Sequence, residues 1–341
     1  MNLTIALIMI SGIVAQMTKE AGSDVTLSRE YFFSEYQRAL ADLKASYSQG
    51  YATGTYKSSK RQVNNGKYKA IDDEEIGAVD ESARINLKKK GENSLLELRG
   101  DKPSAIIGPR QIVLSHGSKY SFALEAKPDL RNGTAVLKSF TKATGGPKKK
   151  DAFFGIYLEP VFKAPFDLQS DDISSLLNHP DSIKDISAFR ENGKIYIKAN
   201  FYHNHSKKYD RYGYFVVSPE EGWALVKYDT GLKDLKTGRV YDHCVGGINE
   251  YALSKDRPPI LRKVQCFLFA ERREYEFDRF DLGPVSDDEF TLAAYGLPEI
   301  GESPRRRNFA RWYLGIGLIV AVIGVGFRYL SIWLRKRKPC T

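Results

Sequence analysis

The sequence lacks the short motifs that mark common catalytic and nucleotide-binding sites. It has no Gly-x-Ser-x-Gly nucleophile elbow, no His-Glu-x-x-His zinc motif, no phosphate-binding loop and no Cys-x-x-Cys pair. Paired carboxylates that meet only in the folded protein leave no such trace, so a hydrolase stays an alternative. The absences favour a protein that is not an enzyme, and they leave no catalytic or cofactor-binding residue to name.

Cysteine is scarce, with three residues in 341. Cys340 stands at the very end of the chain, so only Cys244 and Cys266 belong to the central region. Both fall in or beside expected strands. A disulfide between them, which an oxidising compartment permits, and two free buried thiols are equally good interpretations of the sequence.

Histidine is also scarce, with five residues. His203 and His205 alternate on an expected strand and therefore point to the same face, and His243 beside Cys244 could complete a mixed metal site. Polar residues on the wet face of a sheet explain the same pattern. We therefore predict neither metal ligands nor a cofactor.

Acidic residues are missing from the C-terminal end. From Arg305 onward there are nine Lys or Arg residues and no Asp or Glu, whereas the rest of the chain holds 43 basic and 42 acidic residues. The net charge of +10 thus belongs to the terminus. A nucleic-acid-binding protein carries its positive patch on the folded domain, so this distribution argues against nucleic acid as a partner.

That basic terminus surrounds a hydrophobic segment, Trp312 to Leu334. Its length gives roughly 34 Å of helix, which is enough to cross a bilayer. Trp312 and Trp333 stand where interfacial aromatic residues belong, and Arg328 lies close enough to one end to reach the headgroups. We expect a single transmembrane helix.

The N-terminal segment Leu3–Ala15 is apolar but too short to span a bilayer, which is typical of a signal-peptide core. No Lys or Arg precedes Lys19, so the usual positive start is missing. A buried strand or helix is the alternative. With a signal peptide, the main domain is periplasmic or extracellular and the tail cytoplasmic. Without one, the domain is cytoplasmic and tail-anchored.

The expected organisation has five parts. They are a signal peptide (1–15), an exported, mainly antiparallel β domain (16–300), a basic linker (301–311), a transmembrane helix (312–334) and a basic cytoplasmic tail (335–341). The membrane is the one partner that these parts imply. The oligomeric state stays open.

Residues Thr26–Gln49 predict a long helix. Phe32, Tyr36, Leu40, Leu43 and Tyr47 recur at steps of three and four residues and share one face. Ser28 or Thr26 can cap its start and Gly50 ends it.

Alternation with period two then predicts strands, and a short helix at Asp172–Asn178 interrupts them before Pro180. The expected strands are 51–57, 83–89, 94–99, 111–115, 120–126, 134–141, 183–190, 194–203, 212–218, 223–229, 239–243, 250–253, 261–281 as one or two strands, and 289–294. Strands and helices do not alternate as a parallel nucleotide-binding sheet requires.

This order of elements resembles the outer-membrane lipoprotein carrier fold, a curled half-barrel wrapped over helices. The resemblance implies an α+β, mainly antiparallel domain with an apolar hollow for acyl chains. Residues 288–299, followed by arginines and a membrane helix, also resemble the ending of many uncharacterised exported bacterial proteins with a C-terminal anchor. The carriers themselves lack such a helix, and this chain has no lipobox-type Cys near its start.

Two functions follow as expectations. One is a membrane-anchored exported protein that holds a lipid or another hydrophobic ligand in the concave face of its sheet. The other is a structural or interaction domain of a cell-envelope complex without a small-molecule ligand.

Cleavage of the first segment is directly testable. We expect the mature protein to begin at or near Gln16, because Ala15 ends the apolar core. Mass spectrometry of the N-terminal peptide from membranes of expressing cells measures this. An intact Met1 peptide in the membrane fraction contradicts export by a cleaved signal and favours the tail-anchored topology.

Overall fold

The computed structural model describes residues 25–61, 63–64, 67–73, 78–100, 111–116, 120–126, 136–142, 159–169, 172–204, 206–252 and 258–297. The chain divides into two compact units, Met1–Phe290 and Thr291–Thr341. The first contains the whole β-sheet. In the described part of the second, the 3₁₀ helix η5 (Leu292–Tyr295) ends at Gly296, whose φ of 71° is left-handed.

One long helix, α2, dominates the helical part of the first unit. Ser28 caps α2 by accepting a hydrogen bond from the Tyr31 amide, as the sequence predicts. The described helices of this unit are α2 (Arg29–Ser46), η1 (Ile71–Asp73), α4 (Glu159–Phe162), α5 (Ile173–Leu177), η2 (Pro180–Ser182), η3 (Pro219–Glu221) and η4 (Asp287–Phe290).

The strands form one antiparallel sheet of 14 among the described residues, together with a separate small hairpin, β3–β4. Their bounds are β1 (Val25–Thr26), β2 (Gln49–Lys60), β3 (Val63–Asn64), β4 (Lys67–Tyr68), β5 (Val79–Lys90), β6 (Asn93–Gly100), β7 (Gln111–His116), β8 (Tyr120–Ala126), β9 (Val136–Lys142), β10 (Ile183–Glu191), β11 (Lys194–Asn204), β12 (Tyr209–Ser218), β13 (Ala224–Asp234), β14 (Val240–Ala252), β15 (Ile260–Leu268) and β16 (Glu271–Asp281).

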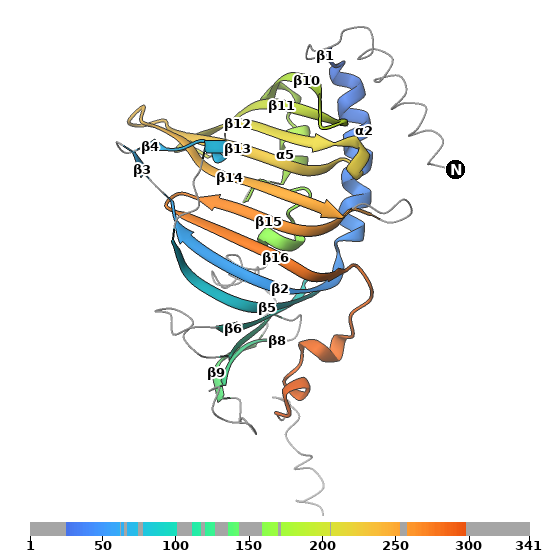
Figure 1. Cartoon of the computed structure of the whole chain (residues 1–341), viewed down its shortest axis with the longest axis vertical. Coiled ribbons are helices and arrows are strands. Elements are labelled where there is room, and N and C mark those ends of the chain that lie inside the picture. The colour runs from blue at the N-terminus through green and yellow to red at the C-terminus, as the bar shows by residue number, and fades with distance from the viewer. Residues whose placement is uncertain are drawn as a thin grey trace, which may run out of the picture. The chain divides into compact units, whose positions relative to one another are not determined.

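The sheet is a pair of meanders joined in the middle. One meander runs from β10 to β16 and the other from β2 through β5 to β9, and β16 pairs with β2 from Glu271↔Lys60 to Asp281↔Tyr51. At this junction Tyr56 and Tyr275 are direct partners, with ring centroids 5.2 Å apart. The sheet curls and stays open (Figure 1), which confirms the expected half-barrel at the level of its shape.

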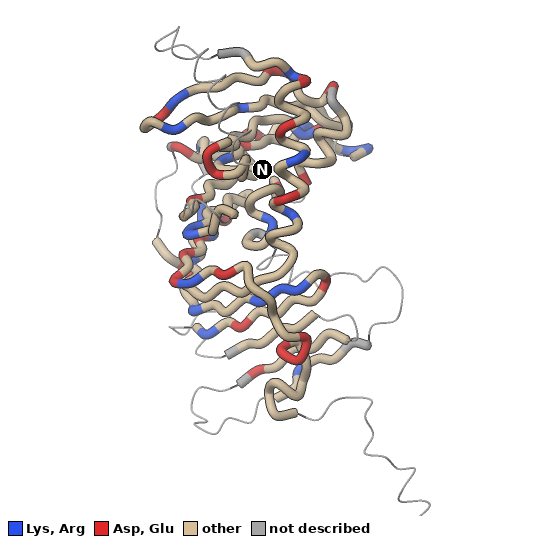
Figure 2. Tube along the Cα trace, turned by 90° about the vertical axis from the view of Figure 1, so that its right-hand side faces the viewer, with Lys and Arg blue, Asp and Glu red and all other residues tan. Residues whose placement is uncertain are grey.

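The helix α2 runs across the strands on one face of the sheet, referred to as the inner face (Figure 1). Its five periodic residues are all buried there, with exposures of 3 % or less. Phe32 and Tyr36 pack against Phe215 of β12, with centroids 6.4 and 6.0 Å apart. Figure 2 shows basic and acidic residues interspersed over the side of the molecule that it presents.

The hairpins, the long helix and the short helix thus occur where the sequence predicts them. The long helix is shorter than predicted, since Thr26 belongs to β1, Gln49 begins β2 and α2 ends at Ser46, before Gly50. Two predicted strand patterns are wrong. The region 239–253 forms one continuous strand, β14, rather than two. Its middle contains Gly246 and Gly247, and glycine is a residue type that is uncommon in strands. In the structure, a Cβ at Gly247 would meet the Tyr228 ring at 2.5 Å, so the glycine makes room for an aromatic ring across the strand.

The second wrong prediction is a strand at 289–294. The segment instead ends η4 and begins η5. Its two large apolar residues, Phe290 and Leu292, are buried without belonging to a strand, with exposures of 4 % and 1 %. The Phe290 carbonyl accepts a hydrogen bond from the hydroxyl of Ser115 at 3.0 Å, which places η4 on the outer face of β7.

The signal-peptide region 1–15 and the predicted transmembrane segment 312–334 lie outside the described residues. Within the described part of the chain, no helix has the length and apolar character needed to cross a bilayer.

Packing beneath α2 gives a stability prediction. Replacing Leu40, which is 2 % exposed, by Ala should lower the free energy of unfolding by about 2–5 kcal/mol, because it removes buried methyl groups and leaves a cavity. Urea denaturation of the full chain in detergent measures this. The exposed Gln37→Ala on the same helix is the control and should change stability by less than about 0.5 kcal/mol. Equal effects of the two substitutions on the free energy of unfolding would contradict the packing of α2 against the sheet.

Candidate functional site

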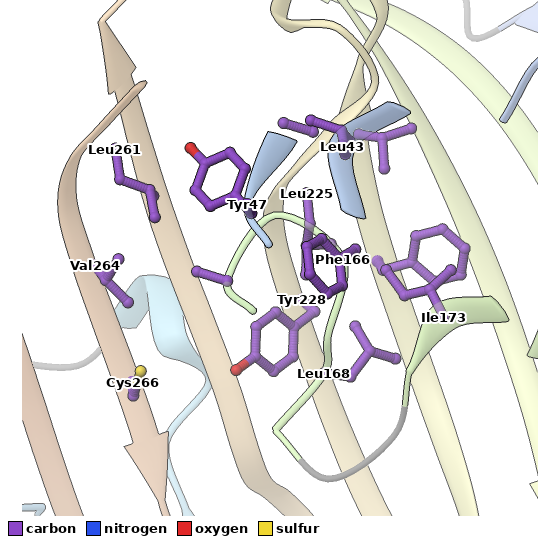
Figure 3. Close-up of a cluster of buried hydrophobic side chains, with 14 of the residues drawn as sticks. Leu43, Tyr47, Phe166, Leu168, Ile173, Leu225, Tyr228, Leu261, Val264 and Cys266 are labelled. Atoms are coloured by element: carbon purple, nitrogen blue, oxygen red, sulfur yellow. The ribbon is translucent and has the colours of Figure 1, made fainter. Parts of the chain in front are cut away.

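The inner face of the sheet is the place where the sequence predicts a hollow, and the chain fills it. Besides α2, the described residues of the segment 161–177 (161–169 and 172–177) lie against this face, and Phe166, Leu168 and Ile173 are each at most 7 % exposed. Figure 3 shows Phe166 and Leu168 beside the strand residues Leu225 and Tyr228, in one cluster with Ile173 and Val264 on either side. Aromatic and aliphatic groups of the protein itself therefore occupy the space beneath α2.

Buried polar side chains of the sheet hold this inner segment in place. Asn249 donates to the Ala164 carbonyl at 2.9 Å and to the Leu225 carbonyl at 2.8 Å. Arg211, which is 2 % exposed, donates to the Leu168 carbonyl at 2.6 Å. A buried irregular segment needs partners for its backbone carbonyls, and the sheet supplies them. Segment 161–177 is thus a built part of the core.

A polar contact also ties the inner segment to α2. Lys44 near the end of α2 donates to the Asp172 carboxylate at 2.5 Å and to the Ser174 hydroxyl at 2.6 Å. Asp172 in turn caps α5 through the Ser174 amide at 2.9 Å. These bonds are partly exposed, so each contributes little to stability. They fix the position of α5 relative to the end of α2.

The histidines considered for a metal site do not converge. His203 on β11 and His243 on β14 are separated by β12 and β13, so three inter-strand spacings of about 4.8 Å place their strands roughly 14 Å apart. The Nδ1 atom of His203 faces the Ser182 hydroxyl at 3.2 Å, and its ring stacks on His179. His205 lies outside the described residues. Among the residues that are described, no group of three metal-ligating side chains occurs.

The two central cysteines are free and buried. Cys266 pairs with Gly247, three residues from Cys244 along β14, so the two side chains are not opposite one another. Burial raises the pKa of the Cys244 thiol to about 11 and that of Cys266 to about 12. Both thiols are therefore protonated at neutral pH and unsuited to nucleophilic chemistry.

A histidine–carboxylate pair that the sequence did not reveal lies on the outer face. The Nδ1 atom of His243 lies 2.7 Å from Asp229 of β13, and these side chains are 41 % and 3 % exposed respectively. The irregular register between β13 and β14 near Thr230 brings them together. Sequence reasoning singled out His243 but not its partner, because 13 residues and a strand pairing separate the two.

The backbone around this pair is unusual. His243 has a φ of 52°, a left-handed conformation that costs a non-glycine residue on the order of 1 kcal/mol or more. Arg61, which is 5 % exposed, donates to the carbonyls of His243 at 3.0 Å and of Lys69 at 2.9 Å. It thereby binds the segment after β2 to β14 and holds the strained residue.

Electrostatics set the limits of what this pair can do. Burial raises the pKa of Asp229 above its ordinary value, while the adjacent His243 and a backbone hydrogen bond from Ile71 oppose that rise. A buried carboxylate at Nδ1 fixes the orientation of a half-exposed imidazole, as in many catalytic and metal sites. Orientation alone defines neither a substrate nor a reaction.

Comparison with known proteins adds no identity. No protein-family model matches the chain, and no curated protein matches it.

The raised pKa of Asp229 makes a pH prediction. Below its unfolded pKa the carboxyl is neutral in both states, and as pH rises the unfolded state ionises first. The wild type therefore loses stability through the window between the unfolded and the raised folded pKa. Asp229→Asn carries no such charge, so its stability relative to the wild type should improve as pH rises from the ordinary pKa of an aspartate to the raised pKa of Asp229.

Asp234 provides the matched control, because its pKa is shifted in the opposite direction to that of Asp229. Backbone amides of Thr237 and Lys236 lower the pKa of Asp234, so its ionised form stabilises the folded protein above the unfolded pKa and that stability is lost as pH falls. Asp234→Asn should thus become less stable relative to the wild type as pH rises. Urea denaturation at several pH values compares the variants, and parallel trends would contradict the assignment of Asp229.

Proposed function

We propose that this chain is a membrane-anchored, exported interaction domain of the cell envelope, with no small-molecule ligand in its concave face. The observation that supports this most is the filled inner face. Tyr36, Tyr47 and Phe215 are fully buried beneath or within it, and Asn249 and Arg211 are committed to the inner segment. A domain whose concave side is occupied by its own chain offers partners its outer surface and its strand ends.

Export and anchoring are part of the proposal. The support comes from the sequence, through the apolar segment Leu3–Ala15 and the segment Trp312–Leu334 with its aromatic and basic flanks. In this topology one helix tethers the protein, the sheet faces the periplasm or the exterior, and residues 335–341 face the cytoplasm.

Carriage of a lipid or another hydrophobic ligand is the second candidate. One observation favours it: the hydroxyl of Tyr36 is buried beneath α2 without a hydrogen-bond partner among the described residues. An unpaired buried hydroxyl costs about 1–3 kcal/mol, which lowers the free energy needed to lift α2 from the sheet. In this alternative, α2 would be displaced as the ligand enters.

Lipid analysis separates the two candidates. We expect native mass spectrometry of the full-length protein, released gently from detergent, to give the mass of the chain without a stoichiometric lipid, because the space beneath α2 is filled. Lipid around a membrane helix exchanges with added detergent, whereas a ligand under α2 should resist exchange.

The variants Leu40→Ala and Gln37→Ala complete the test. Leu40 lies on the buried side of α2 and Gln37 on its exposed side. A detergent-resistant lipid whose occupancy changes in Leu40→Ala but not in Gln37→Ala would establish lipid carriage and overturn the ligand-free proposal.

A further inference from the structure

Exposed apolar side chains gather at one end of the sheet. Leu235 and Val240, in and next to the β13–β14 turn, are 44 % and 49 % exposed, and Phe269 in the β15–β16 turn is 42 % exposed. Successive hairpins alternate between the two ends of an antiparallel meander, so these turns and the β11–β12 turn share one end. Figure 1 shows them together at the left of the sheet. Five of the seven large hydrophobic residues that are exposed in the described chain lie here or within a few residues of it, namely Val79, Tyr202, Leu235, Val240 and Phe269.

Two of these turns adjoin and form a single surface. The Leu235 amide donates to the Lys208 carbonyl at 2.9 Å, and Tyr209 pairs with Asp234 across β12 and β13. We refer to residues 206–209 and 233–241 together as the hairpin tip. Residues 206–208 and 235–240 are all exposed.

The hairpin tip is basic. Its carboxylate Asp234 is buried and accepts the amides of Lys236 at 2.8 Å and Thr237 at 3.1 Å, so it is committed to the turn. The neighbouring Asp210 is also buried and accepts a hydrogen bond from Tyr202. Against these two acids stand five exposed cations: Lys207, Lys208, Lys233, Lys236 and Arg239.

Tyrosines border the same surface. The ammonium group of Lys208 lies 4.8 Å from the centre of the Tyr209 ring, and the Arg239 guanidinium lies 4.9 Å from that of Tyr241. Tyrosine combines an apolar ring with a polar hydroxyl, which suits a boundary between water and hydrocarbon. Aliphatic side chains, cations and tyrosines thus occur together within two turns.

We propose that the hairpin tip binds an anionic phospholipid surface, with Leu235 and Val240 entering the interface and the five cations contacting the headgroups. This combination of buried apolar area and electrostatic attraction is what drives peripheral membrane binding. Nucleic acid offers no apolar layer for two branched aliphatic side chains, and recognition of its bases uses planar groups. The inference deepens the proposed function by naming a membrane partner for the hairpin tip at one end of the strands. It does not depend on the C-terminal helix.

The test uses the full-length protein in nanodiscs of neutral phosphatidylcholine. We expect it to float with vesicles that contain phosphatidylglycerol and not with pure phosphatidylcholine vesicles. Lys236→Glu combined with Arg239→Glu should weaken the binding at least about tenfold, because two headgroup attractions become repulsions. Leu235→Ser combined with Val240→Ser should weaken it as well, including at high salt, where the electrostatic term is screened.

A charge reversal elsewhere on the sheet is the control. Lys184 and Arg190 are exposed on β10, and Lys184→Glu combined with Arg190→Glu makes the same change in net charge. It should reduce binding far less than the tip reversal. Unchanged thermal unfolding in all three double variants confirms that they fold.

Several outcomes would overturn the proposal. They are full binding by the Lys236→Glu, Arg239→Glu variant, an equal loss in the β10 control, no effect of the two serine substitutions, and binding of a DNA fragment as tight as that of the vesicles. Failure of the anchor is a separate result: a chain recovered without membrane extraction refutes anchoring, and the vesicle experiment then proceeds on the soluble protein.

Discussion

The pairing of β16 with β2 is the constraint on which the rest of the sheet depends. More than 200 residues of sequence separate these strands, yet they sit side by side and join two meanders that are otherwise local hairpins. The Tyr56–Tyr275 contact at the junction buries two large rings where the meanders meet. Such a contact pays a loop-closure cost that local hairpins avoid. Without it, each meander would present an unpaired central edge and half of an inner face.

Once the sheet is continuous, its curl decides what the inner face needs. A concave apolar surface has to be shielded from water. The helix α2, which precedes β2, and the segment 161–177, which follows β9, pack against it. The sheet contributes polar groups for the backbone of that cover through Asn249 and Arg211. Truncating such a buried side chain leaves a backbone carbonyl without a hydrogen bond. The resulting loss of stability is larger than the net stabilisation that the hydrogen bond provides. Among the described residues, the part of the inner face beneath α2 is therefore protein core.

The sequence allowed the hairpins and α2 to be predicted because their signals are local. Alternation and short turns mark β10–β13, and a 3–4 repeat marks α2. The prediction failed where tertiary contacts override local signals. Gly246 and Gly247 lie between the two strands predicted at 239–243 and 250–253, yet they continue one strand, because they leave room for the side chains of Ile71 and Tyr228 respectively. The hydrophobic residues of segment 161–169 follow neither a helical nor a strand period. Its conformation depends on hydrogen bonds from the distant side chains of Asn249 and Arg211 to its backbone carbonyls. Asp229 and His243 meet through a register irregularity that no spacing rule encodes.

The distribution of strain and charge follows from the same division of faces. Asp229 is buried on the outer face with a raised pKa, and His243 holds a left-handed backbone. Both features cost stability, and the hydrogen bonds of Arg61 to neighbouring carbonyls are what maintain them. The hairpin tip differs, because its carboxylate Asp234 is hydrogen-bonded within the turn and the neighbouring Asp210 to Tyr202, while the cations of the tip stay in solvent. A protein selected only for stability would bury Leu235 and pair those cations. Leu235 and these cations instead stay exposed at the ends of the strands, and this is the observation behind the proposed contact with an anionic lipid surface.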